Sequence, residues 1–237
     1  KEFVLPDGRL TVETQTAYLL ALAFNLLPEN LREPAANNLV ANIRDLDWHL
    51  STGFIGISHL NPQLTLAGHA DTAYRLLLQD TYPSWLYPVK YGATTIWERW
   101  NGWTDKDGFF HPLMNSFNHY SLGSVGEWLF RHVAGIELDP TQPGFQHFIL
   151  RPYIPASGTI DHVRATYRTL HGQIESAWKR EGSQLTWTIR IPANCTARIH
   201  IPGTPVSTDG LTNNASASNL TTLTAPAGRY TFTSTLS

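Results

Sequence analysis

The sequence predicts a two-part chain of α+β class, a helical region followed by an antiparallel β-sandwich. Two observations carry this prediction. Apolar residues recur with the helical period of 3.6 in the first part, and they recur with a period of two after Gly135. A polar, proline-containing segment, 137–144, lies between the two patterns. We therefore place the boundary between a domain of residues 1–136 and a domain of residues 137–237.

The first predicted helix covers residues 14–27 and is closed by Pro28. Its apolar residues lie nearly all round the helix, as a helix buried on every side requires. The second has Pro34 in its first turn and one apolar stripe of Leu39, Val40, Ile43 and Leu46. A buried helix followed by an amphipathic one is the unit of a double ring of helices.

Similar pairing recurs more weakly over 69–80 and 83–90, and a last helix is predicted over 122–133 with Gly135 at its C-terminal cap. Beyond it, Leu185, Trp187, Ile189 and Ile191 alternate with polar residues, which is typical of a half-buried strand. Tyr230 and Phe232 continue the pattern, and further strands are expected at 148–153 and 162–170. Turn signals follow at 171–172, 181–182 and 209–210.

The composition excludes several classes of protein. Among 237 residues, 17 basic and 19 acidic side chains give a net charge of −2, which excludes nucleic-acid binding through a basic face. Cys195 is the only cysteine, so no internal disulfide forms, and no Cys/His cluster has zinc spacing. No metal or other cofactor is expected.

The beginning of the sequence and its apolar stretches predict a soluble piece of a longer product. The sequence starts at Lys1 without methionine and without a signal-peptide pattern. Its longest apolar stretch, 17–27, is shorter than the roughly 20 residues of a membrane helix. We expect no contact with a membrane and a chain that is processed or truncated.

A tryptophan-rich segment, 93–103, is the best candidate for chemistry. It contains Trp97, Trp100 and Trp103 with Glu98 among them. Indole rings stack on the C–H faces of sugars, and a carboxylate among them can activate water or protonate a glycosidic oxygen. The alternative is that the tryptophans belong to the core and Glu98 pairs with an arginine, either Arg99 or Arg75.

A second polar and aromatic segment, 114–120, precedes the last helix. Its His119 could hydrogen-bond sugar hydroxyls. Alternatively, Asn115, Ser116 or Asn118 caps the helix and His119 is satisfied locally. Glu127 is a rival carboxylate, but helix periodicity gives it a structural or surface role.

Other polar positions carry less chemistry. The segment 105–107 is interpreted as a solvated loop tip, and the ten-residue spacing of His49, His59 and His69 as chance. Sequons at Asn194, Asn214 and Asn219 favour a secreted, extracellular eukaryotic glycoprotein.

Six blocks of the helical region together resemble the C-terminal half of the α-L-rhamnosidases of glycoside hydrolase family 78. In order they are TQTAY at 14–18, WHLSTGFIG at 48–56, TYPSWLY at 81–87, GATTIWERW at 92–100, NSFNHY at 115–120 and GSVGEWL at 123–129. The segment GFQHFILRP at 144–152 resembles the entry into the family's C-terminal β-sandwich.

This resemblance implies part of an (α/α)₆ barrel followed by a β-sandwich, and hydrolysis of terminal α-L-rhamnose with inversion. It implies that Glu98 is the catalytic base and that His119 contacts the rhamnose. Trp100 as an aromatic wall follows from the chemistry of the segment. The family's general acid lies upstream of TQTAY, so we expect an N-terminal portion of the same enzyme to supply it as a partner and to complete the barrel.

Two other functions remain open from the sequence. One is an inverting (α/α)₆ hydrolase or lyase acting on a different sugar. The other is a non-catalytic carbohydrate-binding or structural fragment that retains the aromatic site without the acid.

Overall fold

The structure is a computed structural model that describes residues 2–211 and 221–236. It divides the chain into two compact units, Lys1–Gly126 and Glu127–Ser237. The first is helical and the second is built on one multi-stranded sheet, so the predicted α+β class is confirmed. The domain boundary between residues 136 and 137 stays a prediction, because compactness alone does not define a domain.

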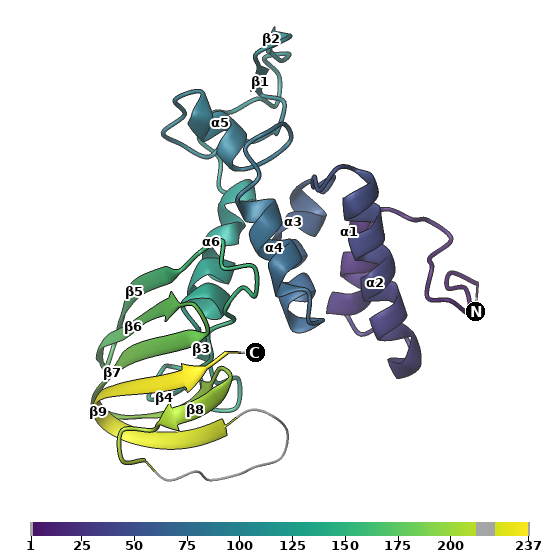
Figure 1. The fold of residues 1–237 in the computed structure, drawn as a ribbon. Helices are drawn as coiled ribbons and strands as arrows, with labels where there is room; N and C mark the ends of the chain where they lie inside the picture. Colours follow the sequence, from purple (N-terminus) through teal and green to yellow (C-terminus); the bar gives the residue numbers. More distant parts are fainter. Residues whose placement is uncertain (1, 212–220, 237) are drawn as a thin grey trace. The chain divides into compact units, whose positions relative to one another are not determined.

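Among its described residues, the first unit contains the four longer helices α1 to α4 and a loop-rich extension (Figure 1). Its elements are α1 (Gln15–Ala23), α2 (Glu29–Asp45), α3 (Phe54–Leu66), α4 (Ala70–Leu77), α5 (Leu86–Lys90), β1 (Trp103–Thr104), β2 (Gly108–Phe109) and the 3-10 helix η1 (Ser121–Ser124). Helix α1 packs against α2 and α3, and α3 packs against α4. In the described part of the chain, no helix has both the length and the apolar character needed to cross a membrane.

Helix α1 begins where Thr14 caps it, since the Thr14 side chain accepts a hydrogen bond from the Ala17 amide at 3.1 Å. It ends at Ala23, earlier than the predicted Leu27. Asn25 has a φ of 54°, a left-handed conformation that stops the helix before Pro28 is reached.

Helix α2 begins at Glu29, so the prediction that Pro34 lies in its first turn is wrong. Its buried stripe of Ala35, Ala36, Leu39 and Ile43 packs against the core, whereas Leu46 is exposed. The amphipathic pattern was therefore predicted correctly, but the start was not, because the helix accommodates Pro34 in its interior.

Helix α3 was not predicted. It contains Pro62 and several polar residues, which obscure its apolar period. Gly56 permits close packing here, because a Cβ on it would lie 2.7 Å from Thr16 Oγ1 on α1. This approach fixes the loop before α3, which contributes to the site described below.

The predicted last helix forms as three short stretches: η1, α6 (Val125–Trp128) and a π-helical turn, η2 (Leu129–Val133). Gly135 follows with a φ of 76°, as the predicted cap requires.

The second unit is a seven-stranded sheet in the order β3-β4-β7-β6-β5, with β9 paired to β7 and β8 paired to β9 (Figure 1). Its strands are β3 (Ile136–Leu138), β4 (His147–Leu150), β5 (His162–Thr169), β6 (Gly172–Glu181), β7 (Gln184–Ile201), β8 (Thr204–Ser207) and β9 (Thr221–Thr235). The described pairings are antiparallel except that β4 runs parallel to β7. The sheet is therefore mixed, whereas the sequence predicted a wholly antiparallel arrangement.

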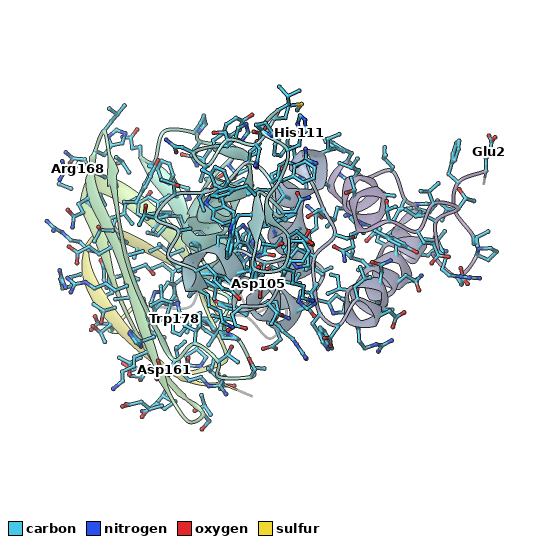
Figure 2. The ribbon with its side chains drawn as sticks, turned by 90° about the horizontal axis from the view of Figure 1, so that it is seen from above. Glu2, Asp105, His111, Asp161, Arg168 and Trp178 are labelled. Carbon is cyan, nitrogen blue, oxygen red and sulfur yellow. The ribbon has the colours of Figure 1, made fainter. Side chains whose placement is uncertain are left out.

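Strand β7 is central and shows the predicted alternation. Leu185, Trp187, Ile189 and Ile191 are all buried. Register shifts between Ile191 and Thr196, and there β7 exchanges β6 for β4 as a partner. Trp178 of β6, labelled in Figure 2, donates its indole N–H to the Val133 carbonyl at 2.8 Å and so ties the sheet to η2.

The segment 137–144, predicted as a polar linker, begins within the fold of the second unit and is exposed from residue 140 to residue 144. Strand β3 occupies its first two residues, and the Asp139 side chain is buried. Asp139 Oδ1 accepts hydrogen bonds from the Thr141 amide and hydroxyl at 2.9 and 2.7 Å, which lower the pKa of the Asp139 carboxyl. These contacts hold the start of the segment in the folded unit.

The predicted glycosylation sites fall at one described and two undescribed positions. Asn194 is exposed on β7 with a φ of 59°. Asn214 and Asn219 lie outside the described residues.

Candidate active site

Two loops of the first unit, 93–102 and 113–120, are joined by backbone hydrogen bonds. The Glu98 amide donates to the Ser116 carbonyl at 2.8 Å, and the His119 amide donates to the Ile96 carbonyl at 2.8 Å. The two segments that the sequence singled out are thus brought together.

Glu98 is half-buried, and one oxygen of its carboxylate is fixed. The Ser116 amide donates to Glu98 Oε2 at 2.7 Å, which closes a reciprocal pair with the backbone bond. Within the described chain, no hydrogen bond or ion pair engages Oε1. A carboxylate held by one oxygen and open at the other can accept a proton from water.

The arginines that had been considered as partners of Glu98 are engaged elsewhere. The Arg99 guanidinium carbon lies 4.4 Å from the centroid of the Phe110 ring, and that of Arg75 lies 3.8 Å from the Trp48 ring. Both are cation–π contacts. The alternative of a structural Glu98–Arg pair is therefore not found in the structure.

Trp100 is held in a fixed orientation beside Glu98. Its indole N–H donates to the Thr52 carbonyl at 2.8 Å, and its ring meets Trp85 edge to face at 5.6 Å. The Trp85 N–H in turn donates to the Leu122 carbonyl at 2.8 Å. These contacts fix the Trp100 ring before a ligand binds. Binding therefore costs little further side-chain freedom at this residue.

Glu98 and Trp100 share a cavity of about 360 Å³, in the size range of small-ligand sites. Its wall is formed by Gly53, Phe54, Tyr82, Glu98, Arg99, Trp100, Asn101, Met114 and Leu122. The wall combines aromatic rings with one carboxylate, one guanidinium group and one amide, a set of groups suited to a sugar ring.

His119 is not in the wall of this cavity but stacks on a residue that is. Its ring lies 5.0 Å from that of Phe54 with an interplanar angle of 5°. His119 Nδ1 accepts the Ser121 amide at 3.3 Å, so a neutral imidazole carries its proton on Nε2. His119 therefore offers a hydrogen-bond donor next to the cavity.

The alternative for this segment is found in part. His119 is satisfied locally by the Ser121 amide, but no side-chain hydrogen bond is made at the N-cap of η1, so Asn115, Ser116 and Asn118 do not cap it. Asn115 instead donates to the Gly102 carbonyl at 3.0 Å, and the Ser116 hydroxyl accepts from the Asn118 amide at 3.2 Å. These side chains shape the loop itself.

Gln15 is a positioning residue that sequence reasoning missed. Its fully buried side chain donates to the His49 carbonyl at 3.1 Å and accepts from the Ser51 amide at 2.8 Å. It thereby holds the loop whose Thr52 carbonyl receives Trp100. The available signal was a glutamine at the start of an otherwise apolar helix.

The remaining candidates lie in other surroundings. Glu127 is exposed and pairs with Arg131 at 2.5 Å, consistent with the surface role given to it. His49 bonds Thr81, His59 meets Phe24 edge to face, and His69 precedes α4, so the three histidines share no site. In the residues that the structure describes, no group of three His, Cys, Asp or Glu is placed to hold a metal ion.

Comparisons with known proteins agree on one family. Residues 1–133 match the family model of the bacterial alpha-L-rhamnosidase 6 hairpin glycosidase domain, and residues 135–216 match that of the bacterial alpha-L-rhamnosidase C-terminal domain. An alpha-L-rhamnosidase of Streptomyces avermitilis is 46% identical over 200 residues, which cover 84% of this chain but only 19% of that protein.

Solved structures show the same relation. The crystal structure of the Streptomyces avermitilis alpha-L-rhamnosidase complexed with L-rhamnose matches 98% of this chain and 22% of its own, with a TM-score of 0.89 at 41% identity. The native enzyme of Aspergillus terreus matches 98% of this chain and 25% of its own, with a TM-score of 0.85 at 29% identity. The chain thus spans about a quarter or less of the proteins that it resembles.

Proposed function

This chain belongs to the bacterial α-L-rhamnosidase family, and we propose that it forms part of a glycoside hydrolase that removes terminal α-L-rhamnose by an inverting mechanism. The observation that carries the proposal is the Glu98 carboxylate, fixed through Oε2 and open at Oε1 in an aromatic-walled cavity.

In the proposed mechanism, Glu98 takes a proton from a water molecule as the water oxygen forms a bond to C1 of rhamnose. The bond from C1 to the leaving oxygen breaks on the opposite face, and a second carboxyl group protonates that oxygen. Inverting enzymes hold two such carboxyl groups about 6.5–9.5 Å apart. The acid belongs, in this proposal, to an upstream portion of the enzyme.

The same portion would complete the helical domain. The matched family domain is described as having six hairpins, which corresponds to the paired helices of an (α/α)₆ barrel. Helices α1 to α4 supply only part of such a ring, so we assign this chain the C-terminal half of the barrel and a C-terminal β-sandwich domain.

Two further residues would bind the sugar. The fixed Trp100 ring would stack on an apolar face of the rhamnose ring. His119, whose Nδ1 is taken by the Ser121 amide, would donate from Nε2 to a rhamnose hydroxyl. This role requires His119 to act at the edge of the cavity, beside Phe54.

A matched pair of variants tests the assignment of Glu98 in the full-length protein that contains this chain. Because the amide of Glu98→Gln cannot accept a proton, we expect kcat to fall by about 10²–10⁴-fold while rhamnose still binds. Glu127→Gln removes an equally charged but exposed side chain and should leave kcat near that of the wild type.

The measurements are steady-state hydrolysis of an aryl α-L-rhamnoside and titration with free L-rhamnose. Near-wild-type turnover by Glu98→Gln would refute the assignment. A large loss of kcat in Glu127→Gln would instead assign the role of catalytic base to Glu127.

A further inference from the structure

A second cavity of about 570 Å³ lies beside the candidate active site and has no role in the mechanism above. Its wall is formed by Asp80, Thr81, Tyr82, Tyr87, Lys90, Tyr91, Asn101, Thr104, Asp105, Lys106 and Asp107. Tyr82 and Asn101 also line the cavity that contains Glu98. A ligand in the second cavity would therefore lie directly next to a sugar bound at Glu98.

One side of this cavity is a row of aromatic rings. Tyr82 meets Tyr87 at 5.7 Å, Tyr87 meets Tyr91 at 5.0 Å, and Tyr91 meets Trp103 at 5.1 Å. Tyr87 is buried, whereas Tyr82 and Tyr91 remain 45% and 46% exposed. The row is thus anchored in its middle and presents ring surface to a ligand at its exposed members.

Asp105, labelled in Figure 2, is fixed against this row by both of its carboxylate oxygens. The Tyr87 hydroxyl donates to Oδ1 at 2.8 Å, and the Tyr91 hydroxyl donates to Oδ2 at 2.9 Å. These two hydrogen bonds lower the pKa of Asp105, so the carboxylate is ionised at neutral pH. Because each oxygen has a second lone pair, Asp105 can still accept hydrogen bonds from a ligand.

The charges around the cavity favour a neutral ligand. Asp80, Asp105 and Asp107 stand against Lys90 and Lys106, and the Lys90 ammonium is already paired with Asp80 at 3.0 Å. An anionic group would meet an excess of carboxylates. A ring with several hydroxyl groups would instead find acceptors in Asp105 and Thr104, an amide in Asn101, and stacking surface in the tyrosines.

We propose that this second cavity is the subsite for the leaving group, and that it binds a neutral sugar, the one to which the terminal rhamnose is attached. Asp105 accepts hydrogen bonds from hydroxyls of that sugar, and Tyr82 and Tyr91 stack on it. The inference rests on the proposed function, since it assigns the cavity to a substrate of the Glu98 site.

The test compares two substrates in the full-length protein: a disaccharide of α-L-rhamnose linked to glucose, and a 4-nitrophenyl α-L-rhamnoside, which has no second sugar. Asp105→Asn keeps the size of the side chain and removes the charge together with one of the two acceptor oxygens, so one tyrosine hydroxyl must turn to accept from the new amide. We expect kcat/KM for the disaccharide to fall about tenfold, the loss expected for one charge-assisted hydrogen bond, with kcat/KM for the aryl substrate unchanged.

A second variant, Tyr91→Ala, removes stacking surface together with the hydrogen bond from the Tyr91 hydroxyl to Asp105 Oδ2, and it should also lower kcat/KM for the disaccharide. Asp45→Asn at the end of α2 is the matched control, because Asp45 is an exposed carboxylate outside both cavities. Asp45→Asn should leave kcat/KM unchanged for both substrates.

Three results would overturn the proposed subsite. Asp105→Asn could lower kcat/KM equally for both substrates, Asp105→Asn could leave kcat/KM for the disaccharide unchanged, or the wild type could cleave only the aryl substrate. Failure of the wild type on both substrates, or full activity of Glu98→Gln, would instead refute the proposed function. The two proposals therefore fail by different results.

Discussion

Glu98 and Glu127 carry the same charge, but their neighbours give them different chemistry. The Glu127 carboxylate forms an ion pair with the Arg131 guanidinium at the surface. Arg99 follows Glu98 directly in the sequence, yet its guanidinium group is held over the Phe110 ring, and that of Arg75 is held over the Trp48 ring. The Ser116 amide orients Glu98 without neutralising it. A base needs this combination of fixed geometry and unpaired charge.

His132 is a buried titratable side chain of the second unit, and it makes folding depend on pH. Neither ring nitrogen has a hydrogen-bond partner among the described residues. Burial, reinforced by Arg131 and Arg151, lowers the pKa of His132 from 6.5 to about 4. The folded protein therefore keeps the imidazole neutral where the unfolded chain would protonate it.

This shift predicts acid sensitivity between pH 6.5 and about 4. In that window the unfolded state binds more protons, so the free energy of unfolding should fall as the pH falls, by up to about 3 kcal/mol. Below pH 4 both states are protonated and the contribution levels off. Urea unfolding followed by tryptophan fluorescence at several pH values measures the slope.

His132→Phe should reduce the slope, since it removes this titrating group and keeps an aromatic ring beside Tyr153. His171→Gln, in the exposed turn between β5 and β6, serves as the control and should leave the slope unchanged. An unchanged slope in His132→Phe would contradict this explanation.

The join between η2 and the sheet depends on Gly135. Its φ is 76°, and a Cβ placed on it would lie 2.2 Å from the Pro152 nitrogen. Gly158 has a similar φ of 65° but no atom within 4 Å of the corresponding position. The two glycines therefore separate backbone strain from steric clash.

Gly158→Ala should cost about 1–2 kcal/mol of unfolding free energy, the penalty for a left-handed alanine. Gly135→Ala should cost at least about 2 kcal/mol more, because the 151–152 backbone must also move. Equilibrium unfolding of both variants provides the comparison. Equal losses would show that the close approach to Pro152 has no energetic weight.

How far the sequence predicts the fold differs between elements. The alternation in β7 is readable because a strand that buries one face repeats every two residues. Helix α3 was missed and α2 was started too late because Pro62 and Pro34 lie inside helices that tertiary packing maintains. At those two prolines, tertiary packing maintains a helix that local sequence preference would interrupt.

The candidate site was predictable as segments but not as contacts. Three tryptophans around a glutamate mark the first segment in the sequence alone. The bonds that arrange it are long-range: Trp100 to Thr52, and Gln15 to Ser51. Asp105 was interpreted as a solvated loop tip, because its tyrosine partners are distant in sequence.

Taken as a whole, the first unit exposes several large apolar side chains. Phe24, Leu26 and Ile55, at the ends of α1 and α3, are all exposed. Exposed apolar groups of this size are typical of surfaces that another part of a protein covers. In the proposed enzyme that part is the upstream half of the barrel, which also brings the general acid.

The inverting mechanism fixes the stereochemistry of the product. If water activated by Glu98 attacks the face opposite to the leaving group, the first sugar released from an α-L-rhamnoside is β-L-rhamnose. Proton NMR, recorded during hydrolysis by the full-length protein and before mutarotation, distinguishes the two anomers. We predict the β-anomer first, and no release by Glu98→Gln. Initial release of α-L-rhamnose, or release by the variant at the wild-type rate, would contradict the mechanism.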